Sequence, residues 1–323
     1  MTHNTLSMLP KIPGQVPEEP YLTYVRQFLL KLYQEGYSMS TLKTYGWHMY
    51  KLGLWLTENG ISTPDQVTPA LTIEWGSRAR TMYSPQTQKQ GAVVTKAFFK
   101  FLSDMKYCRE QIAQDVSKFL AIPKVSITLQ RTFNEEELDV LFSSCNDSSM
   151  QSVRSRALIA LLLDTGLRAG ELCRIKMTDI DFEKKRIEII GKGGNQEFVY
   201  FSQKCEQALN EWFAIREKIA KSDNLFISLG GFTPGEAITT RGLRIILKKM
   251  GERSGIENVH PHAFRRSFAT LRIKNKGQST RGVQRLGRWR NLETFERYTQ
   301  ALMVDDEFAM NEANNYSLLG DYI

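Results

Sequence analysis

The segment TDIDFEKKRIEIIGKGGNQEFVYFS, residues 178–202, is the stretch of this chain in which apolar and polar residues alternate. A period of two places successive side chains on opposite faces of a β-strand. The alternation breaks at 183–185 and again at 192–195, where charged residues, glycine and asparagine favour turns. The segment therefore predicts a three-stranded antiparallel meander.

Helical periodicity dominates the rest of the chain. The first helix is expected in YLTYVRQFLLKLYQEG, residues 21–36, which ends on a glycine suited to a helix C-cap, and a second in residues 40–60. A third begins with Ser84 as the N-cap and Pro85 in the first turn, and a short helix covers about 110–120. The fold class is therefore mostly α with a small three-stranded antiparallel sheet.

The pattern also divides the chain into segments. Residues 1–19 contain several prolines and little periodicity, which is typical of a flexible tail, and residues 20–124 form a helical domain. Residues 125–133 show no helical periodicity and are expected to be a linker. The second domain, 134–323, restarts with Asn134 as an N-cap followed by three glutamates, and it ends in an acidic tail.

Composition narrows the class of protein. The 323 residues include 43 Lys and Arg against 35 Asp and Glu, a formal charge of +8, which suits a polyanionic partner or simply a mildly basic protein. The four cysteines form no C-x-x-C pair, so neither a zinc ribbon nor a disulfide framework is expected. Free cysteines fit a location in the reducing cytoplasm. The most apolar run, 157–163, is far shorter than the roughly 20 residues that cross a bilayer. No membrane association is expected.

Several cations lie on the polar faces of the first domain's helices, with threonines between them. Lys43, Lys89 and Lys96 are the candidates for contacts with a phosphate backbone. A solvated helix face gives the same pattern, so these residues alone do not indicate DNA binding.

Four short motifs in the second domain carry residues capable of phosphate chemistry. In LLLDTGLRAGELCRI, residues 161–175, a Gly-flanked turn presents Arg168, with Glu171 three residues later. A purely structural interpretation makes Arg168 an ion-pair partner of Glu171 or Asp164. In GKGGN, Lys192 is placed at a hairpin tip, where an exposed lysine is common.

The other two motifs lie closer to the C-terminus. In HPHAFRRSFAT, residues 260–270, His262 and Arg265 share one helix face, and Arg266 lies off that face, where it could meet backbone phosphate. In LGRWRNLETFERYTQ, residues 286–300, Trp289 lies near a helix start and Tyr298 near its end. Each motif is weak by itself, because its residues also occur as ordinary packing or surface residues.

Together these residues suit one reaction, metal-free transfer at a phosphodiester. Arg168 and Arg265 can stabilise charge on the non-bridging oxygens, and Tyr298 can attack phosphorus and become covalently attached. His262 can carry the proton, and Lys192 can protonate the departing hydroxyl. Trp289 can donate its indole N–H to a phosphate oxygen. No metal and no cofactor is required, because a cationic cradle replaces magnesium.

The second domain resembles the tyrosine recombinase, or phage integrase, family through four stretches, TGLRAGEL, GKGG, HAFRRSFAT and RYT. The resemblance implies that the six residues named above are catalytic, with Glu171 as a supporting acid. It also implies that residues 20–124 are a core DNA-binding domain, and that 134–323 is the catalytic domain. Two departures are Arg266, where many members have histidine, and LGRW in place of LGH, which makes Arg288 an extra cation for DNA contact.

The resemblance implies a site-specific recombinase that cuts and rejoins duplex DNA through a 3′-phosphotyrosine intermediate, in integration, excision or resolution of a mobile DNA element such as a transposon. Its partners would be double-stranded target sites, with a homotetramer on two paired sites and a place for accessory DNA-binding proteins. The two-domain layout is similar to that of Xer-like and transposon recombinases. The alternatives are relaxation of DNA by a type IB topoisomerase and a non-catalytic DNA-binding protein of the same fold.

Overall fold

The computed structural model describes residue 17 and residues 19–125, 131–191, 194–274, 278–292 and 295–296. The chain divides into two compact units, Met1–Ser126 and Ile127–Ile323. Helices and a small antiparallel sheet make up the described part, which confirms the expected fold class. Among the described residues, no helix combines the length and the apolar character needed to cross a membrane.

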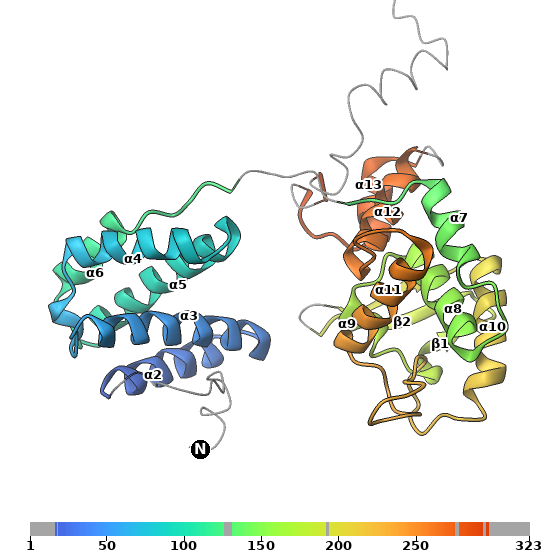
Figure 1. Cartoon of the computed structure of the whole chain (residues 1–323), viewed down its shortest axis with the longest axis horizontal. Helices are drawn as coiled ribbons and strands as arrows, with labels where there is room; N and C mark the ends of the chain where they lie inside the picture. Colours follow the sequence, from blue (N-terminus) through green and yellow to red (C-terminus); the bar gives the residue numbers. More distant parts are fainter. Residues whose placement is uncertain are drawn as a thin grey trace, which may run out of the picture. The chain divides into compact units, whose positions relative to one another are not determined.

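The regular elements of the first unit are all helices among its described residues (Figure 1). Its helices are α2 (Tyr21–Gln34), α3 (Met39–Glu58), α4 (Pro69–Met82), α5 (Pro85–Asp104) and α6 (Glu110–Phe119), with a 3-10 turn at Pro64–Gln66. Ser84 caps α5 as expected, because its side chain accepts the N–H of Thr87. The core is aromatic, with Phe28 packed edge-on against Phe98 at a ring separation of 5.4 Å.

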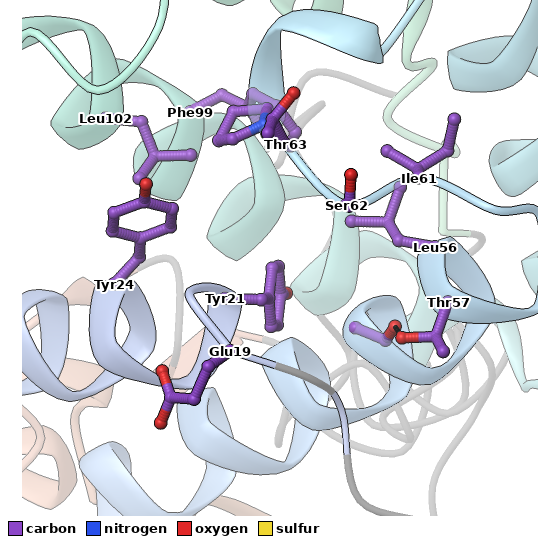
Figure 2. Close-up of a pocket in the computed structure, with 12 residues that line it drawn as sticks. Glu19, Tyr21, Tyr24, Leu56, Thr57, Ile61, Ser62, Thr63, Phe99 and Leu102 are labelled. Atoms are coloured by element: carbon purple, nitrogen blue, oxygen red, sulfur yellow. Dashed lines mark hydrogen bonds between the residues drawn. The ribbon is translucent and has the colours of Figure 1, made fainter.

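A pocket opens within this unit (Figure 2). Tyr21, Tyr24, Leu56 and Leu102 are among the residues that line it. The hydroxyl of Tyr21 donates to the backbone oxygen of Met49 at 2.8 Å, and burial raises the pKa of this phenol well above its usual value. None of the described residues that line the pocket is a lysine, an arginine or a histidine, so the pocket is no candidate for phosphate binding.

The second unit is built around a buried central helix. Its elements are α7 (Glu135–Ser143), α8 (Met150–Thr165), α9 (Ala169–Leu172), a 3-10 turn (Met177–Asp179), α10 (Gln203–Arg216), α11 (Thr240–Ser254), α12 (Pro261–Lys274) and α13 (Thr280–Leu286). Helix α8 packs against both α10 and α12, and it buries Leu158, Leu161 and Leu162 completely. Asn134 caps α7 as predicted, and it also forms a capping box with Glu137.

The predicted meander is present in this unit. Strands β1 (Ile180–Asp181), β2 (Arg186–Ile190) and β3 (Gln196–Tyr200) lie in the order β1-β2-β3, and both pairs are antiparallel. In β2 the buried residues are Ile187 and Ile189, which alternate with more exposed neighbours as a one-sided sheet requires. The connection between β2 and β3 falls where the sequence predicts the second turn.

Candidate active site

The turn between α8 and α9 fixes the position of Arg168. Helix α8 ends at Gly166, whose φ of +58° is the left-handed conformation that glycine adopts without strain. A Cβ on Gly166 would also lie 2.7 Å from the ring of Phe268 on α12. Glycine therefore serves both the turn and the close approach of α12. The chain then re-enters a helix with Arg168 at the N-cap of α9.

Glu171 holds Arg168 at two points. One carboxylate oxygen accepts the backbone N–H of Arg168 at 2.8 Å, and the other accepts from its guanidinium at 2.6 Å. The side chain of Glu171 is only 5% exposed, whereas that of Arg168 is 40% exposed. Burial raises the pKa of Glu171, but the charges of Arg288 and Arg168 outweigh burial and leave this pKa below its usual value. Glu171 is thus an ionised, buried carboxylate that orients the partly exposed guanidinium of Arg168.

Arg265 approaches the same place from α12. It is 2% exposed and donates to the backbone oxygens of Gly166 and, at 2.5 Å, of Gly287. Its guanidinium also lies 4.1 Å from the ring centre of Trp289, a cation–π distance. Trp289 packs in turn on Phe268 and Phe295. A phosphate oxygen would have to share or replace the backbone carbonyls that Arg265 contacts.

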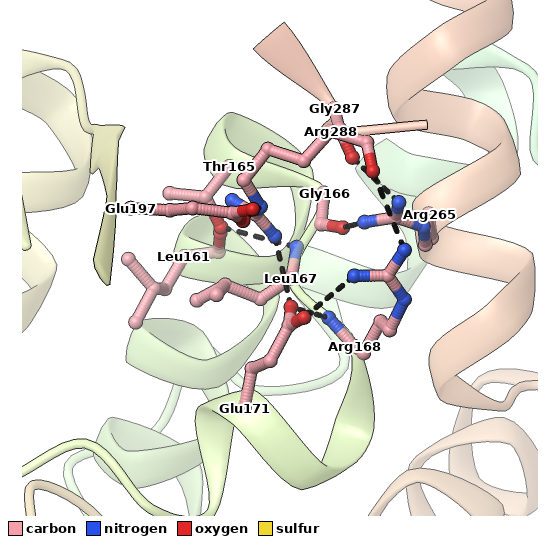
Figure 3. A network of polar contacts seen from close by, with 10 residues as sticks. All are labelled: Leu161, Thr165, Gly166, Leu167, Arg168, Glu171, Glu197, Arg265, Gly287 and Arg288. Carbon is pink, nitrogen blue, oxygen red and sulfur yellow. Dashed lines mark hydrogen bonds and ion pairs between the residues drawn. The ribbon is translucent and has the colours of Figure 1, made fainter. Parts of the chain in front are cut away.

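Both arginines meet at the backbone that follows α13. Arg265 donates to Gly287, and Arg168 donates to the carbonyl of Arg288 at 3.4 Å. Figure 3 shows both guanidinium groups turned toward this pair of residues, that of Arg168 from the N-cap of α9 and that of Arg265 from α12. The sequence predicts that these arginines converge, and the structure brings them together.

His262 lies on the first turn of α12 and is exposed. Partial desolvation lowers the pKa of His262, and the positive charges of Arg266, Arg265, Arg244 and Arg168 lower it further. Its imidazole is therefore close to a group of cations and stays neutral at neutral pH. His260 has a structural role, because its Nδ1 accepts the N–H of Ala263 at 3.1 Å and so caps α12.

Two arginines that the sequence places at a DNA surface lie inside the protein. Arg266 is 6% exposed, and its Nε donates to the backbone oxygen of Arg131 at 2.7 Å. The side chain of Arg288 is 8% exposed and forms ion pairs with Glu171 at 2.8 Å and Glu197 at 3.3 Å. The expectation of surface phosphate contacts is corrected for both residues, because protein acceptors hold their guanidinium groups.

The other expected DNA contacts belong to the first unit. Lys43 on α3 and Lys89 on α5 are exposed. Lys96 on α5 is half-buried, and its ammonium donates to the backbone oxygen of Ser117 at 2.7 Å. All three remain predictions, since exposure alone does not identify a DNA contact.

Two predicted site residues, Lys192 and Tyr298, lie outside the described residues. The turn around the former is described on both sides: the Gly191 N–H donates to Asn195 at 2.8 Å, and Gly194 has a φ of +82°. For the phenol, the nearest described neighbours in sequence are Phe295 and Glu296. The roles of both residues stay predictions.

Sequence reasoning missed Arg244 and Glu197. Arg244 is an exposed cation on α11 whose charge lowers the pKa of both His260 and His262, so it belongs to the same positive surface. The basic pattern of α11 is a signal that could have drawn attention to it. Glu197 gives no comparable signal, because a charged residue in a short strand is usually a solvated one.

Comparison with known proteins identifies the family. Residues 131–304 match the Phage integrase family, and the match spans more than half of the chain. The chain belongs to the phage integrase family. The match includes every predicted site residue of the second unit, among them Tyr298.

Relatives of this integrase-family chain include the tyrosine recombinase XerC of Staphylococcus aureus (strain JH9), which is 36% identical over 181 residues. The match covers 56% of this chain and 60% of the XerC protein. XerC of S. aureus strain N315 matches to the same extent. The chain thus spans less than two thirds of the length of these relatives.

Solved structures agree on the fold. XerH recombinase bound to a palindromic difH substrate, in a post-cleavage complex, has a TM-score of 0.68 at 21% identity, over 97% of this chain and 92% of XerH. The Tn1549 transposon integrase in complex with a circular intermediate DNA has a TM-score of 0.65 at 18% identity. The match covers 90% of this chain and 99% of the Tn1549 integrase. A lambda integrase dimer bound to a core site has a TM-score of 0.66 at 14% identity. The match covers 86% of this chain and 94% of the lambda integrase chain. At these identities the likeness concerns the fold of this integrase-family chain.

Proposed function

We propose that the chain is a site-specific DNA recombinase that cuts and rejoins duplex DNA through a covalent 3′-phosphotyrosine intermediate. The observation that carries the proposal is the convergence of Arg168 and Arg265 on the backbone of residues 287–288, with His262 on the same helix as Arg265. Two guanidinium groups beside an imidazole form a cradle for a phosphodiester whose charge grows in the transition state.

In the proposed cleavage step, the phenolic oxygen of Tyr298 attacks phosphorus, and the bond from phosphorus to the 5′ oxygen breaks. His262 suits the acceptance of the phenolic proton, because its lowered pKa keeps the imidazole neutral at neutral pH. Lys192 would supply a proton to the departing 5′ oxygen. The products are a phosphotyrosine at the 3′ end and a free 5′ hydroxyl. Attack by a 5′ hydroxyl from a second duplex reverses the step, so rejoining needs no ATP.

The cationic cradle supports a reaction without a metal ion, since arginines can neutralise the non-bridging oxygens directly. Adduct formation should therefore be unchanged by EDTA. For the assembly, the DNA complexes of XerH and of the Tn1549 integrase, together with the lambda integrase dimer on its core site, support a DNA partner. We propose that four copies of the chain assemble on two paired DNA sites. Accessory DNA-binding proteins would join this complex. A DNA substrate is compatible with a cytoplasmic location.

A capture experiment tests the proposal and selects the DNA site at the same time. Purified protein is mixed with duplexes that carry a randomised central segment and scattered single-strand nicks, so that a short fragment released by cleavage diffuses away. Protein-linked DNA is isolated under denaturing conditions and sequenced. We expect a common sequence motif in the captured DNA, and no adduct with Tyr298→Phe, which should still bind the captured duplex.

The rival functions give different results in the same system. A wild-type protein that binds a selected sequence but forms no adduct would overturn the proposal in favour of a non-catalytic DNA-binding protein. An adduct accompanied by relaxation of plasmids carrying a single site, with no exchange between paired sites, would favour topoisomerase activity.

A further inference from the structure

The sequence suggests that Arg288 contacts DNA, but in the structure its side chain faces the protein interior. We infer that Arg288 is a positioning residue for strand cleavage, which acts through Glu171 on Arg168 and through Glu197 on the β2–β3 hairpin. The inference rests on the proposed function, since it concerns the geometry of the same phosphate cradle.

The first observation is the backbone at Arg288. Its φ of +60° is a left-handed conformation that residues other than glycine, asparagine and aspartate seldom adopt. The conformation turns the chain sharply after α13 and exposes the Arg288 carbonyl to the guanidinium of Arg168. Strain of this kind persists where the surrounding contacts hold it in place. Here the N–H of Arg288 donates to the backbone oxygen of Arg285 at 3.0 Å, and the Arg288 side chain adds its ion pairs with Glu171 and Glu197.

The second observation is the pattern of charges behind the cradle. Glu171 accepts from Arg168 through one oxygen and from Arg288 through the other, at 2.6 and 2.8 Å (Figure 3). With Arg288 present, two arginines balance the two carboxylates of Glu171 and Glu197. Without Arg288, the buried Glu171 would depend on Arg168 alone, and it would compete directly with a phosphate for that guanidinium.

The third observation links the network to the hairpin. Glu197 lies on β3, and its carboxylate packs so closely on Gly191 that a Cβ at this glycine would lie 2.8–2.9 Å from it. Arg288 contacts the same carboxylate at 3.3 Å. Gly191 directly precedes Lys192 in sequence, so the ion pair attaches the turn end of the hairpin to the loop that follows α13. One side chain thus connects the segments that carry two of the proposed catalytic groups.

The variant that tests this role must keep the backbone conformation. Arg288→Asn is suitable, because asparagine tolerates the left-handed region while its short neutral side chain reaches neither carboxylate. Arg288→Lys restores the charge without the planar fork that serves two carboxylates. Lys248→Asn is the charge-matched control, since it removes an exposed ion pair with Glu252.

The assay is single-turnover adduct formation on a nicked duplex of the captured sequence, with the equilibrium affinity for the same duplex measured separately. We expect Arg288→Asn to slow adduct formation about 10- to 100-fold, because small displacements of a positioned group have effects of this size. Its affinity for DNA should stay within about threefold of wild type, since the residue is buried. Arg288→Lys should recover part of the rate, and Lys248→Asn should match wild type.

A second variant separates positioning from folding. In Arg288→Asn, a further Glu197→Gln change removes the carboxylate left without a partner, and we expect it to restore stability more than the rate. Wild-type rates in Arg288→Asn, or in the Arg288→Asn, Glu197→Gln double variant if the single variant does not fold, would overturn the inference and leave the proposed function intact. The absence of an adduct with wild-type protein would overturn both.

Discussion

The close approach of α8 and α12 at Gly166 gives a prediction whose magnitude follows from the structure. Alanine at this position would adopt a φ of +58° with its Cβ 2.7 Å from Phe268. The left-handed backbone costs about 1–2 kcal/mol for a residue with a Cβ. The overlap with a packed aromatic ring adds about 1–3 kcal/mol. We therefore expect Gly166→Ala to lower the free energy of unfolding by about 2–5 kcal/mol.

Gly255 provides a matched control at the end of α11. It has a φ of +72°, and a Cβ built on it would meet nothing within 4 Å. Gly255→Ala therefore carries the backbone cost alone, about 1–2 kcal/mol. The difference between the two variants isolates the contact with Phe268.

Urea denaturation followed by circular dichroism gives the free energies, and Phe268→Ala completes the comparison. When the ring is absent, Gly166→Ala should cost no more than Gly255→Ala does, so the two substitutions at Gly166 and Phe268 should be non-additive by about 1–3 kcal/mol. Equal losses in Gly166→Ala and Gly255→Ala would refute the reasoning, because Phe268 would then yield to the added methyl group at no cost.

Two further predictions concern His262 and Trp289. Partial desolvation and neighbouring arginines lower the pKa of His262, so its neutral form predominates above that lowered pKa. Adduct formation should therefore fall as the pH drops from about 6.5 through this pKa. His262→Gln should flatten this limb of the pH–rate profile, whereas a rate that rises with acid would show that the protonated form is active. Trp289→Ala should lower the free energy of unfolding by about 3–5 kcal/mol, because it empties a buried site beneath Arg265. Trp289→Phe should keep most of that stability in urea denaturation but slow adduct formation, and a normal rate would argue against the indole N–H as a phosphate donor.

The sequence is informative wherever local chemistry decides the structure. Ser84 and Asn134 can be recognised as caps because their side chains satisfy N–H groups a few residues away. The meander can be recognised because strand alternation and turn residues are both local signals. Arg168, His262 and Arg265 follow from motif spacing and family resemblance, and the structure brings the two arginines together.

Local chemistry is insufficient where burial depends on distant partners. On α5, Val93 is 43% exposed and Thr95 is buried at 3%, the reverse of what the polarity of the two side chains alone predicts. The sequence places Arg266 and Arg288 at the surface, because an arginine is usually exposed unless an acceptor is available inside. Their acceptors, Arg131 and Glu197, are far away in sequence, and nothing in the local pattern of either arginine points to them.

Both departures from the common family pattern are arginines whose guanidinium groups have acceptors inside the protein. The candidate catalytic arginines donate to the backbone carbonyls of Gly166, Gly287 and Arg288. Two of these positions require glycine, because a Cβ would lie 2.7 Å from Phe268 at Gly166 and 1.6 Å from Trp289 at Gly287. What the sequence must preserve is the conformation of the turn after α13, including the left-handed residue at 288. In this chain Arg288 adopts that conformation, and its ion pairs with Glu171 and Glu197 hold it. The loop therefore constrains the reaction through the positions of its backbone carbonyls, and the ion pairs of Arg288 with Glu171 and Glu197 anchor it to the interior.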